Sequence, residues 1–88
     1  MASHVDVKFL VFASRDSLYY PQAELLAHEL KGQLVDRLSS SLDDLRLVAR
    51  HKVVEPVAIV VLMHGRVVAR FPRLVRKEQL LRDLTGIT

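Results

Sequence analysis

The side chains most able to do chemistry lie in a short polar loop. Residues 14–20 read Ser-Arg-Asp-Ser-Leu-Tyr-Tyr and stand just before Pro21. The chain contains no cysteine, which excludes thiol–disulfide exchange and thiolate metal sites, because both need sulfur. A nucleophilic Ser17 would need an adjacent base and a third orienting group. No histidine lies near it in the sequence, although His51 could approach it in the fold. We therefore predict that Ser17 is not catalytic and caps a helix or fills the loop.

Anion binding and partner binding remain open for this loop. A helix N-terminus attracts anions through its free N–H groups, and Arg15 with the loop serines could hold a phosphate or carboxylate there. Asp16 opposes such a ligand by its charge. Tyr19 and Tyr20 are two of the five aromatic residues. Each tyrosine would serve either as an anchor at a protein interface or as part of the core.

The histidines show no spacing typical of a metal site. They are His4, His28, His51 and His64. Because zinc sites draw several ligands to one point through short sequence spacings, we predict surface histidines and neither a bound metal nor a cofactor.

Composition indicates one globular domain spanning residues 1–88. Half of the 88 residues are hydrophobic, and only three are glycine and three proline, unlike a disordered chain. The N-terminus lacks the basic and apolar regions of a signal peptide. The longest apolar run, Val57–Met63, is far shorter than the roughly 20 residues of a membrane helix. We therefore predict no transmembrane segment and a cytoplasmic location.

Positive charge is concentrated in the last quarter of the chain. Net charge is +3, but residues 66–88 hold six Lys/Arg against two Asp/Glu. Arg66 and Arg70 are an even number apart, which predicts one shared strand face. The candidate basic patch consists of Arg66, Arg70, Arg73, Arg76 and Lys77. Such a patch is either an ordinary solvated surface or a site for an anionic partner.

Hydrophobic periodicity predicts four strands. Residues 5–13 begin in alternation and become continuously apolar, which indicates a strand that enters the middle of a sheet. Val57–Met63 is apolar throughout and predicts a central strand. His64-Gly65 predicts a two-residue hairpin into a return strand over residues 67–71. Residues 33–38 favour a short second strand, although a helix continuing past Gly32 would fit the same pattern.

Three helices complete the predicted order. Pro21 suits the first turn of the first helix, and Gly32 suits the position just after its end. Its apolar stripe consists of Ala23, Leu26, Ala27 and Leu30. Ser41 and Asp44 resemble a capping box for the second helix. Its predicted apolar face consists of Leu42, Leu45, Val48 and Ala49. The third helix is predicted over residues 74–84, with Gly86 ending it. The order predicts an α/β fold with a four-stranded mixed sheet and helices on both faces.

This order resembles the thioredoxin-like superfamily, and residues 12–30 most resemble its glutaredoxin branch. In glutaredoxins a strand leads into Cys-Pro-Tyr-Cys, which opens a helix. Aligned without gaps, Ser17 and Tyr20 stand at the two cysteines, and Leu18 and Tyr19 at the residues between them. The segment VVEPV at 53–57 is similar to the family loop that carries a cis-proline, here Pro56. The segment VAIVVLMHGRVVARF is similar to the family's strand–turn–strand unit.

The departures from the family decide what the resemblance implies. Both cysteines are absent, so we expect no oxidoreductase activity. The Gly-Gly and acidic residue through which glutaredoxins hold glutathione are also absent from residues 70–74, Arg-Phe-Pro-Arg-Leu. Glu55 precedes the proline, where its charge would repel an anionic ligand.

The resemblance implies a redox-inactive adaptor or chaperone-like module that binds another protein. In the family this edge docks extended polypeptide in the manner of an added strand. The expected contact residues are Arg15, Ser17, Tyr19, Tyr20, Glu55 and Pro56. One alternative is a glutathione- or anion-binding transferase-like domain that uses Ser17 or Tyr19. Another is a basic module that binds RNA or a membrane surface. The outer strands of the sheet could also pair in a homodimer.

Overall fold

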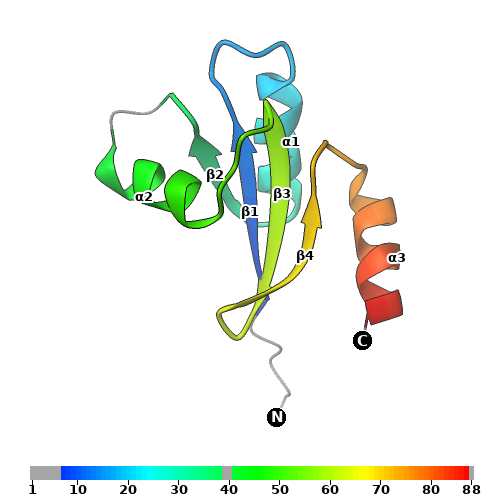
Figure 1. Ribbon diagram of the computed structural model, residues 1–88. Coiled ribbons are helices and arrows are strands. Elements are labelled where there is room, and N and C mark those ends of the chain that lie inside the picture. The colour runs from blue at the N-terminus through cyan, green and yellow to red at the C-terminus, as the bar shows by residue number, and fades with distance from the viewer. Residues whose placement is uncertain (1–6, 39–40, 88) are drawn as a thin grey trace.

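The computed structural model describes residues 7–38 and 41–87. These residues form four strands and three helices (Figure 1). Their order is β1 (Val7–Ala13), α1 (Tyr20–Glu29), β2 (Gln33–Asp36), α2 (Leu42–Arg50), β3 (Val57–Met63), β4 (Arg66–Phe71) and α3 (Lys77–Ile87). The fold is thus α/β, as the sequence predicted. The prediction for residues 5 and 6 lies outside the described residues.

The four strands form one mixed sheet in the order β2-β1-β3-β4. β1 pairs with β2 in parallel, because α1 carries the chain back before β2 begins. β3 is antiparallel to both β1 and β4. The central strands β1 and β3 are therefore the most apolar, and β2 and β4 form the edges.

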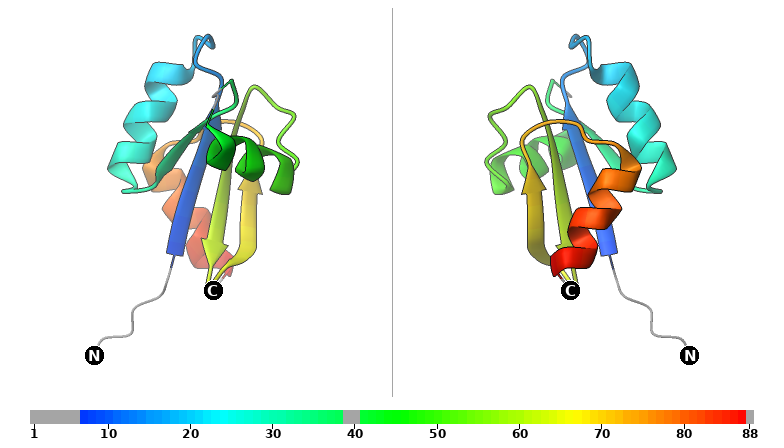
Figure 2. Two further views of the ribbon diagram at one scale, coloured as in Figure 1. Left: turned by 90° about the vertical axis from the view of Figure 1, so that its left-hand side faces the viewer. Right: turned by 90° about the vertical axis from the view of Figure 1, so that its right-hand side faces the viewer.

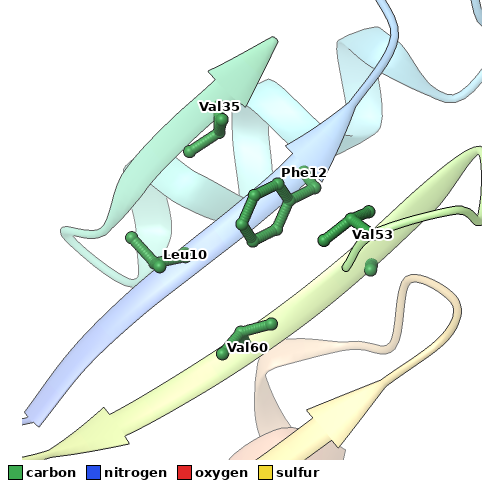
Figure 3. Close-up of a cluster of buried hydrophobic side chains, with 6 residues drawn as sticks. Leu10, Phe12, Val35, Val53 and Val60 are labelled. Atoms are coloured by element: carbon green, nitrogen blue, oxygen red, sulfur yellow. The ribbon is translucent and has the colours of Figure 1, made fainter. Parts of the chain in front are cut away.

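Helices cover both faces of the sheet (Figure 2). α2 lies on one face, over a buried cluster of Leu10, Phe12, Val35, Val53, Ala58 and Val60. Figure 3 shows side chains of this cluster gathered from β1, β2, β3 and the segment before β3. On the other face, α1 contributes Leu26 and α3 contributes Leu80 to a cluster with Ile59 and Val61. The continuously apolar run of β3 follows from this arrangement, because both of its faces are buried.

The first helix buries its predicted stripe but ends differently. Ala23, Leu26 and Ala27 are buried. The residue with positive φ after the helix is Lys31, at 53°, and not Gly32. The Gly32 N–H donates to the Ala27 carbonyl at 2.8 Å, which closes a Schellman motif with Gly32 one position later than predicted. A Cβ at Gly32 would lie 2.6 Å from the Phe9 carbonyl oxygen, so close packing on β1 requires glycine there.

The predicted core face of the second helix is partly wrong. Leu47 and Val48 pack against the core. Leu42 and Leu45 are 61% and 43% exposed, and Ala49 is also exposed. No residue of α2 is fully buried. A nine-residue helix makes only two and a half turns. A small rotation about its axis therefore changes which of its residues contact the sheet.

A β-bulge separates the two arginines of β4. Val61 pairs with Ala69 and Leu62 pairs with Val67, so Val68 is an extra residue in β4. Arg66 lies opposite Met63, whereas Arg70 lies opposite Val60. Met63 and Val60 are an odd number apart on β3 and face opposite sides of the sheet. The prediction that Arg66 and Arg70 share a face is therefore wrong.

The second strand and third helix also differ from the predicted bounds. β2 ends at Asp36 and not at residue 38. α3 begins at Lys77, and residues 74–76 before it have no regular secondary structure. The helix continues through Gly86 to Ile87, so Gly86 does not end it.

Candidate functional site

The β1–α1 loop presents two apolar side chains to solvent. Leu18 is 94% exposed and Tyr19 is 54% exposed. Ser17 supports the turn beneath them, because its hydroxyl accepts the Tyr19 N–H at 3.1 Å and its carbonyl accepts the Tyr20 N–H at 3.1 Å. The N-cap of α1 is Tyr19, which makes no side-chain capping bond. Ser17 is therefore a loop-forming residue and not the predicted helix cap.

Arg15 ties the same loop to the end of β2. Its Nε lies 3.0 Å from Asp36 Oδ2, and its Nη2 donates to the Leu38 carbonyl at 3.0 Å. Asp36 Oδ1 accepts the Arg15 backbone N–H at 3.3 Å and the Leu38 N–H at 2.9 Å. The guanidinium is thus already paired, which reduces the attraction of this loop for an anionic ligand.

The two tyrosines occupy different environments. Tyr20 is half-buried and packs against a cluster that contains Ala13, Ala23 and Val57. Burial raises the pKa of Tyr20 above its ordinary value, and the carboxylate of Asp36 raises it further. Tyr19 points outward, so it is the tyrosine available to a partner.

The α2–β3 loop, residues 51–56, is held to the edge strand by one arginine. Arg70 Nη2 lies 3.0 Å from Glu55 Oε1 and donates to the Lys52 carbonyl at 3.2 Å. Its Nη1 donates to the His51 carbonyl. Val54, next to this contact, is 79% exposed. The loop therefore combines a fixed backbone with an exposed apolar side chain.

Backbone hydrogen bonding sets the pKa of Glu55. Its carboxylate accepts from its own backbone N–H, which lowers its pKa below the ordinary value, and the Arg70 charge and the Val54 N–H act in the same direction. Partial desolvation opposes them. The Val54 N–H donates to Glu55 Oε1 at 3.3 Å, so this amide is already occupied.

The peptide bond before Pro56 is trans. No cis peptide bond occurs among residues 7–38 and 41–87. The cis-proline implied by the family resemblance is therefore absent at Pro56, which is itself exposed.

The sheet brings the two loops to one end of the fold. Ala13, the last residue of β1, pairs with Val57, the first residue of β3. The loop that follows Ala13 and the loop that precedes Val57 therefore lie side by side where they join the sheet (Figure 1). Within the described residues, no hydrogen bond or ion pair joins Glu55 or Pro56 to the β1–α1 loop; the predicted contact residues share an end of the sheet as two separately anchored groups.

His51 is not hydrogen-bonded to Ser17 in the described part of the chain. Its ring packs edge-on against Phe12, with centroids 6.0 Å apart, on the face covered by α2. Burial lowers the pKa of His51, and the charges of Arg50 and Arg70 lower it further. Among the described residues no histidine is hydrogen-bonded to Ser17, whose hydroxyl accepts the Tyr19 N–H, which agrees with a structural role.

The predicted basic residues do not form one surface. Arg70 is bound to the α2–β3 loop, and Arg66 faces the opposite side of the sheet. Arg73 lies in the connection before α3. Arg76 and Lys77 line a hollow of about 420 Å³ between α1 and α3, which Glu29 and Glu78 also line. The carboxylates there offset the positive charge.

Sequence reasoning missed the most exposed apolar residues of this end, Leu18 and Val54. A leucine inside a polar loop was the available signal for Leu18. The carboxylate partners of Arg15 and Arg70 gave no sequence signal, because they lie 21 and 15 residues away along the chain.

No protein-family model and no curated protein matches this chain. Across residues 7–38 and 41–87, no three histidine or carboxylate side chains gather as they would around a metal ion. None of the helices in the described part of the chain has the length and apolar character needed to cross a bilayer.

Proposed function

We propose that this chain is a redox-inactive, thioredoxin-like adaptor or chaperone-like module that binds another protein at the end of its sheet. The contact surface comprises the β1–α1 and α2–β3 loops. Within it, the residues expected from the sequence are Arg15, Ser17, Tyr19, Tyr20, Glu55 and Pro56. Leu18 and Val54 are added because of their exposure.

The strand order and directions support the thioredoxin-like assignment. A parallel β1–β2 pair joined by α1 is followed by an antiparallel β3–β4 hairpin and a last helix, which agrees with the family pattern. The trans bond at Pro56 and the absent cysteines depart from that pattern. Both departures argue against inherited redox chemistry and leave binding as the retained use of this edge.

The observation that carries the proposal is the exposure of Leu18, Tyr19 and Val54 at one end of the sheet. Their exposed fractions are 94%, 54% and 79%. Apolar side chains gathered on a surface are typical of protein contacts, and tyrosine is a frequent anchor in them. The occupied Val54 N–H favours docking through side chains over the addition of a strand.

The alternatives have weaker support. Arg15 and Arg70 both pair with carboxylates. No histidine or carboxylate of the described residues is hydrogen-bonded to Ser17, so no observation favours an anion site or a transferase. The basic residues are divided between surfaces, which disfavours binding to RNA or a membrane surface. A homodimer through the edge strands β2 or β4 stays a prediction.

The test is affinity capture from the native lysate with matched variants. Leu18→Ser/Tyr19→Ser removes the exposed apolar groups without touching the buried clusters. The control is Leu42→Ser, because Leu42 is comparably exposed on α2. We expect one protein partner to be retained by wild type and the control and lost by the double variant. A partner that the double variant retains, but that high salt or Arg73→Gln/Arg76→Gln removes, would contradict the proposal.

A further inference from the structure

A second surface lies on the α2 face, away from the β1–α1 loop. Seven-residue β3 extends about 23 Å at 3.3 Å per residue, whereas nine-residue α2 extends about 14 Å at 1.5 Å per residue. The helix therefore cannot cover the length of the sheet. The left view of Figure 2 shows β1, β3 and β4 continuing past α2 with no other helix over this face.

This uncovered area contains a groove of about 400 Å³. Its apolar lining comes from Leu10, Leu47, Leu62 and Val67. Leu10 is fully buried, whereas Val67 is 52% exposed on edge strand β4. The size falls within the range of small-ligand sites, roughly 300–1,000 Å³, which are lined mainly by apolar side chains with a few polar groups.

The charged groups of the groove are all cationic. Lys8 and Arg50 line it, together with His51 and Gly65, and no carboxylate does. No aspartate or glutamate of the described residues forms a salt bridge with Lys8 or Arg50. The acidic residues of α2, Asp43 and Asp44, stand in its first turn, at the opposite end from Arg50.

We propose that this groove binds a medium-chain aliphatic carboxylate. The alkyl chain lies on Leu47, Leu62 and Val67, and Lys8 and Arg50 hold the carboxylate. Charge distinguishes this groove from the hollow between α1 and α3, where Glu29 and Glu78 accompany the cations. The proposal concerns a surface separate from the sheet end and does not depend on the adaptor function.

His51 provides a built-in reporter of the bound anion. Its neighbours with charge are Arg50 from its own helix end and Arg70 from β4, and both lower its pKa together with burial. A carboxylate held near Arg50 reverses part of this effect. The pKa of His51 then rises when the groove is occupied.

The experiment titrates the full chain with octanoate, followed by amide and histidine NMR signals and by calorimetry, below the concentration at which octanoate forms micelles. 1-Octanol tests the alkyl group without the carboxylate, and acetate tests the carboxylate without the long alkyl group. We expect octanoate to shift signals of Leu47, Leu62 and Val67 and to raise the pKa of His51. Both reference compounds bind at least about tenfold more weakly, because each lacks one of the two interactions.

Variants separate specific binding from general adsorption. Lys8→Gln and Arg50→Gln should each weaken octanoate binding on the order of tenfold, because each removes a charge-assisted contact. Arg66→Gln is the matched control, since Arg66 precedes Val67 but faces the other side of the sheet. Val67→Asp should abolish binding by repulsion, whereas Val67→Asn, of the same shape without the charge, should weaken it less.

Three outcomes would overturn the proposal. The first is equal binding of octanoate and 1-octanol, and the second is an equal loss in the Arg66 control. The third is the absence of octanoate binding while an acidic amphipathic peptide shifts the same signals, which would assign the groove to a protein partner. A test of the sheet-end variant Leu18→Ser/Tyr19→Ser keeps the two proposals distinguishable, because it should leave octanoate binding unchanged.

Discussion

Arg70 and Glu55 form an ion pair with Nη2 and Oε1 3.0 Å apart, and the same guanidinium donates to the His51 and Lys52 carbonyls. One side chain on the edge strand thereby fixes the segment between α2 and β3. The segment carries Val54 toward the proposed partner surface and His51 toward the groove. Arg70 thus links the segment that contributes to both surfaces to the edge strand.

Replacement of Arg70 by alanine should destabilise the fold modestly. Two carbonyls lose a charged donor, which costs about 1–2 kcal/mol in the free energy of unfolding. The exposed ion pair adds little beyond this. Urea denaturation measures the loss, and Arg66→Ala on the same strand should change stability by less than about 0.5 kcal/mol. Equal effects of the two variants would show that the carbonyl contacts do not stabilise the loop.

The Glu55 carboxylate should titrate below its ordinary pKa. Because its folded pKa is lowered relative to the unfolded value, its stabilising contribution is present above the ordinary value of 4.5 and is lost as pH falls through the folded pKa. Carboxyl NMR should show that Arg70→Gln raises the pKa of Glu55 only partly, since the backbone N–H bonds remain. An unchanged value in the variant would contradict a role for Arg70.

His51 should also reduce stability as pH falls, but in a higher pH range than Glu55, because its charged form is disfavoured in the folded state. Burial, Arg50 and Arg70 lower its folded pKa below 6.5. As pH falls through 6.5, the unfolded chain takes up this proton first, so the free energy of unfolding decreases. Arg50→Gln should raise the pKa of His51 in an NMR titration, whereas Arg66→Gln should not. An unchanged or lower pKa of His51 in Arg50→Gln would contradict this explanation.

Alanine at Gly32 should destabilise the protein by roughly 1–3 kcal/mol, the usual cost of overpacking. The added Cβ would meet the Phe9 carbonyl oxygen at 2.6 Å and Phe9 Cβ at 2.9 Å. Gly65→Asn is the comparison, because nothing lies within 4 Å of a Cβ there and asparagine tolerates positive φ. Thermal denaturation should show a clear loss for Gly32→Ala and a small one for Gly65→Asn; the reverse order would refute the packing argument.

Asparagine at position 64 should stabilise the β3–β4 hairpin. His64 and Gly65 both have positive φ, 52° and 80°, as a two-residue type I′ turn requires. Asn-Gly is the favoured pair for this turn, so His64→Asn should raise the free energy of unfolding by about 0.5–1 kcal/mol. Chemical denaturation checks this, with His64→Val as the matched opposite, since a β-branched residue resists positive φ.

The order of elements could be predicted because local patterns specify it. The apolar run of β3 and the His64-Gly65 turn are signals between near neighbours, and the structure confirms both. The stripe of α1 is equally local, and Ala23, Leu26 and Ala27 are buried as its spacing predicts. Helix ends were less accurate. Lys31, and not Gly32, adopts the positive φ at the end of the helix. Glycine is required at position 32 because its backbone lies too close to Phe9 for a Cβ.

The site was predicted as a set of residues but not as an arrangement. Sequence placed Ser17, Tyr19 and Glu55 near one edge through a family resemblance, yet it did not separate the exposed Tyr19 from the half-buried Tyr20. It also placed Arg66 and Arg70 together, because alternation along a strand assumes no bulge. Val68 breaks that alternation through its register against Val61 and Leu62, which is a property of two strands and not of one.

The sequence by itself determined the α/β class, the hairpin, the buried strands and the absence of thiol chemistry, because each depends on residue type or short-range periodicity. Only the tertiary structure decided that Arg15 pairs with Asp36, that Arg70 fixes the α2–β3 loop, and that α2 leaves a cationic groove open. These features join residues far apart in the chain. Their energies depend on distance in space, which local patterns of residues do not encode.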